Sequence, residues 1–261
     1  MTPQKSWAEY LRLGGYLVRM EFARRFAGSL GGRMWVFFSP LVTVIAIWLA
    51  LDLGLGMSGP TGGNYAGGLV VGLAAWLFFA EAVNSSIGMI TASPHLVKKV
   101  VFPVELLPMT TVVTALVVHL FVLSLVALQI LFFGAGWSIR IITLPFWVAA
   151  LTGLAMGIAI LLAGLNVVLR DVSAIAPNII STLFWLTPVI WPSSRLPPSW
   201  QTVLAFNPVS VLIDGYRYAL LAPDYGPSLS RLLVCGLMIC VIGFVSATTF
   251  KALRPAFGDH L

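Results

Sequence analysis

Long apolar runs separated by short polar stretches dominate the sequence. A helix that crosses the bilayer core needs about 20 apolar residues, and backbone polar groups in lipid must hydrogen-bond within their own segment. The runs are therefore predicted to be membrane-spanning helices, the fifth being the shortest. They are Met34–Leu53, Gly67–Ile90, Thr110–Phe133, Leu144–Leu165, Ile175–Ile190 and Leu232–Phe250. This pattern predicts an all-α integral membrane protein with six transmembrane helices.

The N-terminal segment breaks this pattern. From Trp7 to Phe26, Leu, Tyr, Met and Phe are mixed with four arginines. A basic amphipathic helix of this kind lies in the membrane interface, and a solvated basic leader is the alternative. We assign residues 1–33 to a cytosolic amphipathic interface helix and residues 34–261 to a six-span transmembrane domain.

A second exception lies between the fifth and sixth runs. Residues 191–229 are half apolar but are interrupted by six prolines. The stretch Pro208–Leu221 is too short to cross, so we expect short re-entrant helices that begin at Pro198 and Pro208 and return to the outer side. Such an element is tolerated at membrane depth only where it is buried in protein or lines a cavity. The segment therefore indicates a pore entrance.

Charge supports this topology. Only 9% of the residues are charged and 59% are hydrophobic, whereas a soluble domain carries about 25% charge. With the N-terminus inside, 11 of the 15 Lys and Arg residues face the cytosol, and both termini do so. The four outside are Arg140, Arg195, Arg217 and Arg231. The net charge of +6 thus reflects topology, and we expect no nucleic-acid partner.

The sequence argues against an enzyme. It has no phosphate-binding G-x-x-x-x-G-K-[ST] loop, so the chain itself is not expected to hydrolyse ATP. The three histidines, His95, His119 and His260, lack metal-ligand spacing. A membrane-embedded lipid-modifying enzyme would need several acids or histidines at one depth, and an ion channel would need a polar or charged ring. We therefore predict no catalytic residue, no metal and no cofactor bound by this chain.

Glu81 is the notable polar residue within a predicted span. A carboxylate at membrane depth suggests a function or a buried partner. We favour hydrogen bonding to a neighbouring helix, with a proton-coupled role as the alternative.

Two internal loops are polar, and the first is a candidate for contact with a cytosolic partner. The loop 93–108 is bounded by prolines and offers a short helix, although its lysines could instead bind phospholipid headgroups. In the second loop, Asp171 could cap the next helix and Arg170 could anchor the preceding one, which alone could explain the pair. The candidate contact residues of the first loop are His95, Leu96, Val97, Lys98, Lys99 and Val100.

Four motifs in this order carry a resemblance that covers nearly the whole chain. The chain resembles the permease subunit of ATP-binding-cassette polysaccharide exporters, which serve O-antigen, capsule and teichoic acid. The motifs are "LVKKVVFP", "LNVVLRDV", "FWLTPVIWP" and "LAFNPVSVLIDGYRYALL".

The resemblance implies a homodimer in the bacterial inner membrane, driven by two separate ATPase subunits that bind ATP and Mg. It also implies that both internal loops face the ATPase, which adds Arg170 and Asp171 to the candidate contact residues. The implied cargo is a lipid-linked polysaccharide. A related exporter of drugs or lipids is the alternative.

Aromatic residues in two spans are candidates for the glycan path. A polymer of hydrated sugars needs a channel wider than one filled bundle, which favours two copies around a two-fold axis. The apolar faces of sugar rings stack on aromatic rings, although any of these side chains could instead face lipid or a neighbouring helix. The candidates are Trp35, Phe37, Phe38, Trp48, Phe184 and Trp185.

Overall fold

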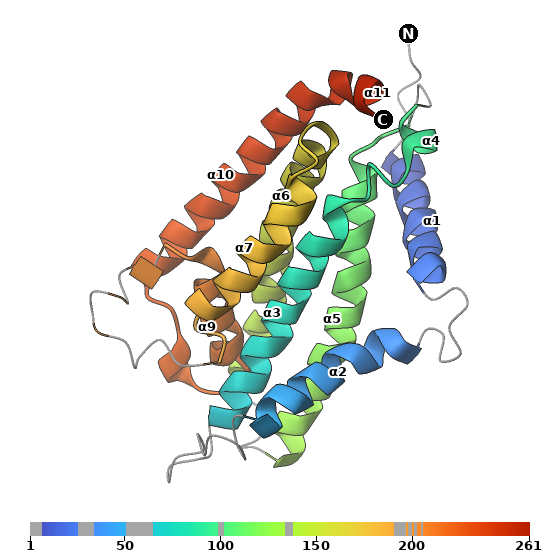
Figure 1. The fold of residues 1–261 in the computed structure, drawn as a ribbon. Helices are drawn as coiled ribbons and strands as arrows, with labels where there is room; N and C mark the ends of the chain where they lie inside the picture. Colours follow the sequence, from blue (N-terminus) through green and yellow to red (C-terminus); the bar gives the residue numbers. More distant parts are fainter. Residues whose placement is uncertain are drawn as a thin grey trace.

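The computed structural model is a bundle of long helices, with no strand in the residues that it describes (Figure 1). These residues are 7–25, 34–50, 65–98, 102–133, 138–190, 197, 200, 203, 204 and 206–261. The helices include α1 (Trp7–Arg25), α2 (Met34–Leu49), α3 (Tyr65–Ile87), α4 (Pro94–Val97), α5 (Leu106–Phe133), α6 (Leu144–Val168), α7 (Val172–Leu186), α9 (Pro208–Leu220), α10 (Leu229–Leu253) and α11 (Phe257–His260). The predicted all-α class is confirmed.

Each of the six apolar runs forms a helix, but the helices differ in length. Four segments are long and apolar enough to cross a membrane, namely Gly67–Ile87, Leu106–Ile130, Ile139–Val168 and Leu229–Ala256. The last two include the short 3₁₀ turns Ile139–Thr143 and Arg254–Ala256. By contrast, α2 has 16 residues and α7 has 15, which is shorter than the roughly 20 that a span usually needs.

The bounds of α7 differ from the predicted Ile175–Ile190. The helix begins three residues earlier, at Val172, and ends at Leu186. Thr187 has an extended backbone, with φ −97° and ψ 139°. This residue precedes Pro188, and the ring of a proline disfavours the helical conformation of the residue before it. The proline therefore ends the helix inside the apolar run.

Helix α3 occupies the centre of the bundle. It packs against α2, α5, α6, α7 and α9, and Leu73, Ala75 and Ala82 are fully buried (Figure 1). Small residues allow this close packing between helices. A Cβ at Gly72 would lie only 2.6 Å from the carbonyl oxygen of Val189. The centre of the bundle is thus built on α3.

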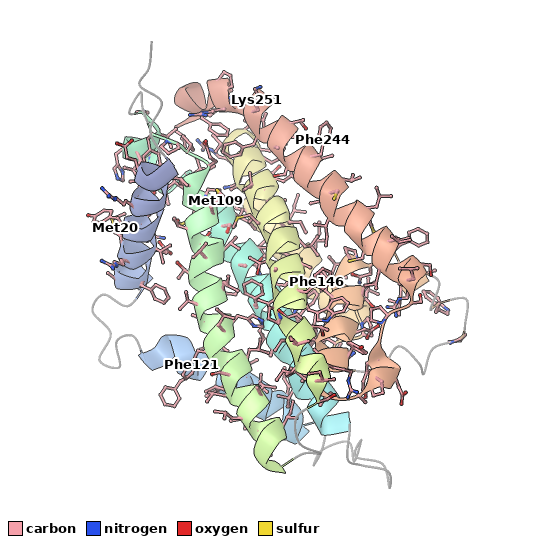
Figure 2. The ribbon with its side chains drawn as sticks, turned by 180° about the vertical axis from the view of Figure 1, so that it is seen from behind. Met20, Met109, Phe121, Phe146, Phe244 and Lys251 are labelled. Carbon is pink, nitrogen blue, oxygen red and sulfur yellow. The ribbon has the colours of Figure 1, made fainter. Side chains whose placement is uncertain are left out.

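Helix α10 lies at the outside and exposes apolar side chains. Leu233, Leu237 and Phe244 are all largely exposed, and Figure 2 shows Phe244 on the outer side of the helix. An apolar helix face of this kind suits a lipid environment.

A second core cluster closes one end of the bundle. Its buried members come from the α3–α5 connection and from α5, α6, α10 and α11. They are Met89, Ile90, Val104, Leu107, Ala163, Val167, Phe250 and Phe257. The phenyl rings of Phe250 and Phe257 meet edge to face with centroids 5.4 Å apart. Figure 1 shows α4, α11 and the α6–α7 turn at this end, with α9 towards the other.

Candidate functional site

The loop after α3 presents cations and buries its apolar residues. His95 and Lys98 are exposed, whereas Leu96 and Val97 pack against the second core cluster. Lys99 and Val100, also predicted to contact the ATPase, lie outside the described residues. The described residues of this predicted contact set therefore fall into two groups. The apolar side chains attach the loop to the bundle, and the polar ones face outward.

The C-terminal segment supports this loop. The guanidinium of Arg254 lies 3.7 Å from the carboxylate of Glu105, which belongs to the connection between α4 and α5. Phe257 is 1% exposed and belongs to the cluster on which Leu96 and Val97 pack. The end of the chain therefore forms part of the platform beneath α4.

Arg170 and Asp171 form the turn between α6 and α7, and both are exposed. The prediction that the side chain of Asp171 caps α7 is wrong. Asp171 occupies the N-cap position, but its backbone is helical and its side chain makes no capping hydrogen bond. A capping side chain normally needs an extended N-cap backbone. Its carbonyl oxygen instead accepts from the backbone amides of Ala174 and Ile175, so both charged side chains remain at the surface.

The six predicted aromatic residues fall into distinct environments. Phe38 is 48% exposed on α2. On α7, Phe184 packs against Trp76 of α3 with ring centroids 5.7 Å apart, while Trp185 is 66% exposed. Phe38 and Trp185 therefore present free ring surface, and Phe184 is partly occupied by packing. The side chains of Trp35, Phe37 and Trp48 lie outside the described part of the chain.

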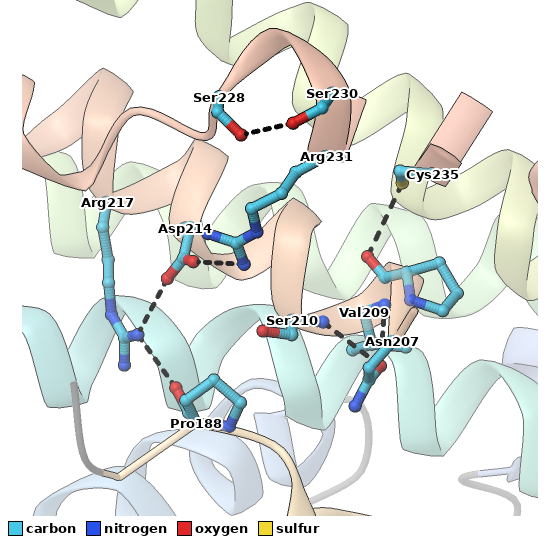
Figure 3. A network of polar contacts seen from close by, with 11 residues as sticks. Pro188, Asn207, Val209, Ser210, Asp214, Arg217, Ser228, Ser230, Arg231 and Cys235 are labelled. Carbon is cyan, nitrogen blue, oxygen red and sulfur yellow. Dashed lines mark hydrogen bonds and ion pairs between the residues drawn. The ribbon is translucent and has the colours of Figure 1, made fainter. Parts of the chain in front are cut away.

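Helix α9 carries a buried charge network that the sequence analysis did not predict (Figure 3). The carboxylate of Asp214 pairs with Arg231 of α10 at 2.9 Å and with Arg217 at 3.5 Å. Arg217 also donates to the carbonyl oxygens of Gly68 at 3.0 Å, Pro188 at 2.8 Å and Val189 at 2.6 Å. One guanidinium thereby joins α9 to the start of α3 and to the chain beyond α7.

The two arginines stabilise the buried carboxylate of Asp214. Burial raises the pKa of Asp214, and the charges of Arg217 and Arg231 act in the opposite direction. A buried charge is costly unless it is paired and hydrogen-bonded. The two arginines therefore offset the loss of water around this carboxylate. The i, i+3 spacing of Asp214 and Arg217 on a helix was the available sequence signal.

The start of α9 is fixed by its own cap. As predicted, the helix begins at Pro208. The side-chain oxygen of Asn207 accepts from the amides of Val209 at 3.1 Å and Ser210 at 3.3 Å (Figure 3). Its Nδ2 donates to the hydroxyl of Thr187 at 2.9 Å. Thus the residue that caps α9 also binds the residue that follows α7. Pro198, the other predicted start, lies outside the described residues.

A cavity of about 730 Å³ lies between α2, α3 and α5. Glu81, Asn84 and His119 are among its lining residues. The ring of His119 stacks on Phe78 with centroids 4.6 Å apart, and its Nε2 lies 3.0 Å from the hydroxyl of Tyr216 in α9. Over the described residues, no group of three or more His, Cys, Asp or Glu side chains could hold a metal ion.

Comparison with known proteins identifies relatives over most of the chain. Residues 14–221 match the family described as ABC-2 type transporter. The chain is 26% identical over 247 residues to an O-antigen export system permease protein, RfbA, of Myxococcus xanthus, covering 94% of each chain. It is 23% identical over 242 residues to a Klebsiella pneumoniae protein of the same name, covering 91% of this chain and 90% of the relative. The resemblance predicted from the four motifs is confirmed.

Proposed function

Since the chain belongs to the ABC-2 type transporter family, we propose that it is the permease subunit of an ATP-driven exporter of a lipid-linked polysaccharide. The similarity to an O-antigen export permease over 94% of both chains carries this proposal. The helical bundle with its long apolar helices supports it. The cargo is a glycan of the O-antigen or capsule type.

The proposed topology has six crossings, with both termini in the cytosol of the bacterial inner membrane. It includes the shorter helices α2 and α7. At 1.5 Å per residue, a helix of 15 residues spans about 22 Å of a core about 30 Å thick. The chain after Leu186 adds length to this crossing, and a bilayer can thin locally around a short helix. On this topology α9 is a re-entrant helix of the outer half.

A separate ATPase subunit supplies the energy, because the chain has no phosphate-binding loop. ATP and Mg bind to that subunit, two copies of which serve one exporter. Exposed His95, Lys98, Arg170 and Asp171 all lie at the end of the bundle that faces the cytosol on the proposed topology. They are the candidate contacts through which ATPase closure reaches the permease.

Two copies of the chain are proposed to enclose the path. Helix α7 has an exposed surface that carries the apolar side chains of Ile175, Ile179, Trp185 and Leu186. This surface is available to a second copy or to the glycan itself. A two-fold homodimer is the simplest closed arrangement that builds one channel from two such bundles.

Deletion of the gene in its host tests the proposed function. We expect loss of the surface glycan, accumulation of lipid-linked glycan inside the cell, and rescue by the intact gene. The permease should also co-purify with an ATPase. An unchanged surface glycan together with altered drug resistance or lipid distribution would instead assign the chain to a drug or lipid exporter.

Cysteine labelling tests the topology in a chain whose two native cysteines, Cys235 and Cys240, are replaced by Ala. Ser228→Cys and Gly258→Cys lie beyond opposite ends of α10 and are both exposed. A membrane-impermeant maleimide should label Ser228→Cys in intact cells and Gly258→Cys only after permeabilisation. Labelling of Gly258→Cys in intact cells would contradict the cytosolic C-terminus.

A further inference from the structure

We propose that Phe257, on the short helix α11, is a positioning residue that holds both cytosolic loops in place for contact with the ATPase. This role rests on the proposed export function, in which the α3–α5 loop and the α6–α7 turn are contacts to that subunit. No residue beyond α10 was among the predicted contacts. Phe257 touches neither glycan nor ATP in this role, because it acts through the loops that it supports.

Helix α4 depends on its surroundings for its position. It has four residues, none of which is buried, and an isolated helix of this length is unstable in water. Its apolar side chains, Leu96 and Val97, pack against the second core cluster. The direction in which the exposed side chains of His95 and Lys98 point is therefore set by the packing of that cluster.

Phe257 is the most deeply buried aromatic residue of the cluster. It is 1% exposed, and its ring meets that of Phe250 edge to face. Phe250 in turn lies directly against α6, because a Cβ at Gly164 would be only 2.9 Å from its ring. Phe257 thus packs on a ring that is itself held by the backbone of a long helix.

A turn after α10 brings Phe257 into this cluster. Residues Arg254–Ala256 form a 3₁₀ turn that contains Pro255, and proline has no N–H to continue the α-helical hydrogen bonds. In a straight α-helix, residues seven apart are separated by about 10.5 Å along the axis. The ring centroids of Phe250 and Phe257 are only 5.4 Å apart. The chain therefore changes direction after α10, and Figure 1 shows α11 at the same end of the bundle as α4.

The packing of Phe257, rather than the nearby ion pair, carries this role. Arg254 and Glu105 lie 3.7 Å apart, and their side chains are 50% and 39% exposed. Ion pairs that are this accessible to water contribute little to stability. A ring buried among apolar side chains contributes far more, because its whole surface is removed from water.

The same cluster reaches the α6–α7 turn. Ala163 and Val167 of α6 are buried members of it, and Val167 lies three residues before Arg170. Asn166 Nδ2 donates to the carbonyl oxygen of Ile87, the last residue of α3, at 3.2 Å. The points at which the two cytosolic connections leave α3 and α6 are thereby joined in one packed unit.

A filled cluster lets movement of the loops reach the bundle. Close-packed protein interiors are barely compressible and transmit strain, so a push on either loop displaces α3 and α6 together. Removal of the Phe257 ring leaves a cavity that the surrounding structure fills only in part. Leu96 and Val97 can then shift without moving the long helices. ATP hydrolysis would continue in that case, while export falls.

Export and ATP hydrolysis, measured on the same reconstituted complex of permease and ATPase, test this role. In Phe257→Ala the amount of glycan exported per ATP hydrolysed should fall severalfold, while the content of assembled complex and its ATPase rate stay near those of the wild type. Phe257→Leu refills most of the lost volume and should restore the ratio. Gly258→Ala is the neighbouring control, because nothing lies within 4 Å of the added Cβ.

Cysteine labelling reports the position of the loop in the full permease with Cys235 and Cys240 replaced by Ala. Inverted membrane vesicles without the ATPase present the cytosolic face to a membrane-impermeant maleimide. Val97→Cys, which packs against the cluster, should react severalfold faster when Phe257→Ala is also present. His95→Cys lies on the same helix but is exposed, so it should react at the same rate in both backgrounds.

Three other outcomes count against the positioning role or against the function on which it rests. If the wild type exports glycan, and Phe257→Ala keeps both its export per ATP and the slow labelling of Val97→Cys, Phe257 does not position the loop. If Phe257→Ala loses assembled complex, hydrolysis and export in the same proportion, the ring serves folding alone and the inference is also overturned. If the wild-type complex hydrolyses ATP but exports no glycan, the proposed function itself fails.

Discussion

Gly215 shows how a single missing side chain fixes the position of α9. A Cβ at this residue would overlap the indole ring of Trp147 from α6, which is itself 5% exposed. The ring cannot move freely, because its Nε1 donates to Thr143 at 3.2 Å and it also meets Phe146 edge to face. The glycine is therefore a packing requirement.

Gly215→Ala should destabilise the folded chain. Overpacking a closely packed interior costs roughly 1–3 kcal/mol, so the melting temperature in detergent should fall. Gly236→Ala on α10 is the matched control, since nothing lies within 4 Å of the added Cβ and Ala favours a helix by about 1 kcal/mol. Equal melting temperatures for the two variants would show that Trp147 yields without cost.

Arg217 and Arg231 both bind Asp214, but they should respond differently to replacement by Lys. Arg217 donates to three carbonyl oxygens and its side chain is 3% exposed, whereas that of Arg231 is 21% exposed. Lysine keeps the charge but cannot reproduce the fork of guanidinium donors. Arg217→Lys should cost roughly 2–4 kcal/mol and Arg231→Lys about 1 kcal/mol. Urea titration in detergent measures both, and a larger loss for Arg231→Lys would contradict this assignment.

The sequence could not assign these roles at the level of residues. The charge count places Arg217 and Arg231 together as external basic residues, because position along the chain is the only information it uses. The partners of Arg217 are backbone carbonyls at Gly68, Pro188 and Val189, and any residue type carries a carbonyl. No pattern of side chains could therefore have indicated them.

At the scale of elements, the apolar pattern located the helix of each of the six apolar runs but not all of the helix ends. Apolar runs report burial in lipid or protein, so they continue through Thr187 and Pro188 although the backbone leaves the helix there. They also miss the first turn of α5, which starts at Leu106 and contains Pro108. Proline is tolerated in the first turn, where its missing N–H has no partner to lose.

The loop that carries α4 should couple to the ATPase through its cations. Lys98 is exposed, whereas Leu96 and Val97 pack on the bundle. The double variant Lys98→Glu with Lys99→Glu should weaken assembly with the ATPase or uncouple ATP hydrolysis from export, as measured by co-purification and glycan export. The control is Lys251→Glu, because Lys251 is also an exposed lysine but lies on α10, away from this loop in the sequence. Normal assembly and export in the double variant would leave these lysines as headgroup contacts.

The α6–α7 turn should tolerate loss of one charge better than reversal of the other. Asp171 makes no capping bond, so Asp171→Asn should change stability by less than the roughly 1 kcal/mol that a working cap contributes. Arg170→Glu places a negative charge at the inner face, against the positive-inside preference, and should lower export more. Export and membrane insertion are measured together. Equal, negligible effects of both variants would identify a tolerant turn.

At the scale of the whole molecule, the exposure of each aromatic ring distinguishes a candidate for the glycan path from a ring packed in the core. The sequence predicted aromatic residues on the fifth span but could not tell which ring packs inward, because Phe184 and Trp185 are adjacent. In the structure Phe184 meets Trp76, while Trp185 is 66% exposed on an outward face of α7. In the proposed homodimer, this face is free for a second copy or for the glycan.

Trp185→Ala and Phe184→Ala should therefore fail in different ways. Removal of the exposed indole should lower glycan export severalfold and leave the melting temperature nearly unchanged, because the ring makes few contacts within its own chain. Phe184→Ala should instead cost roughly 2–3 kcal/mol of stability through lost packing on Trp76. Export, melting temperature and dimer content of the same preparations distinguish the two. If Trp185→Ala exports normally but falls apart into monomers, the indole belongs to the dimer contact and the glycan passes elsewhere.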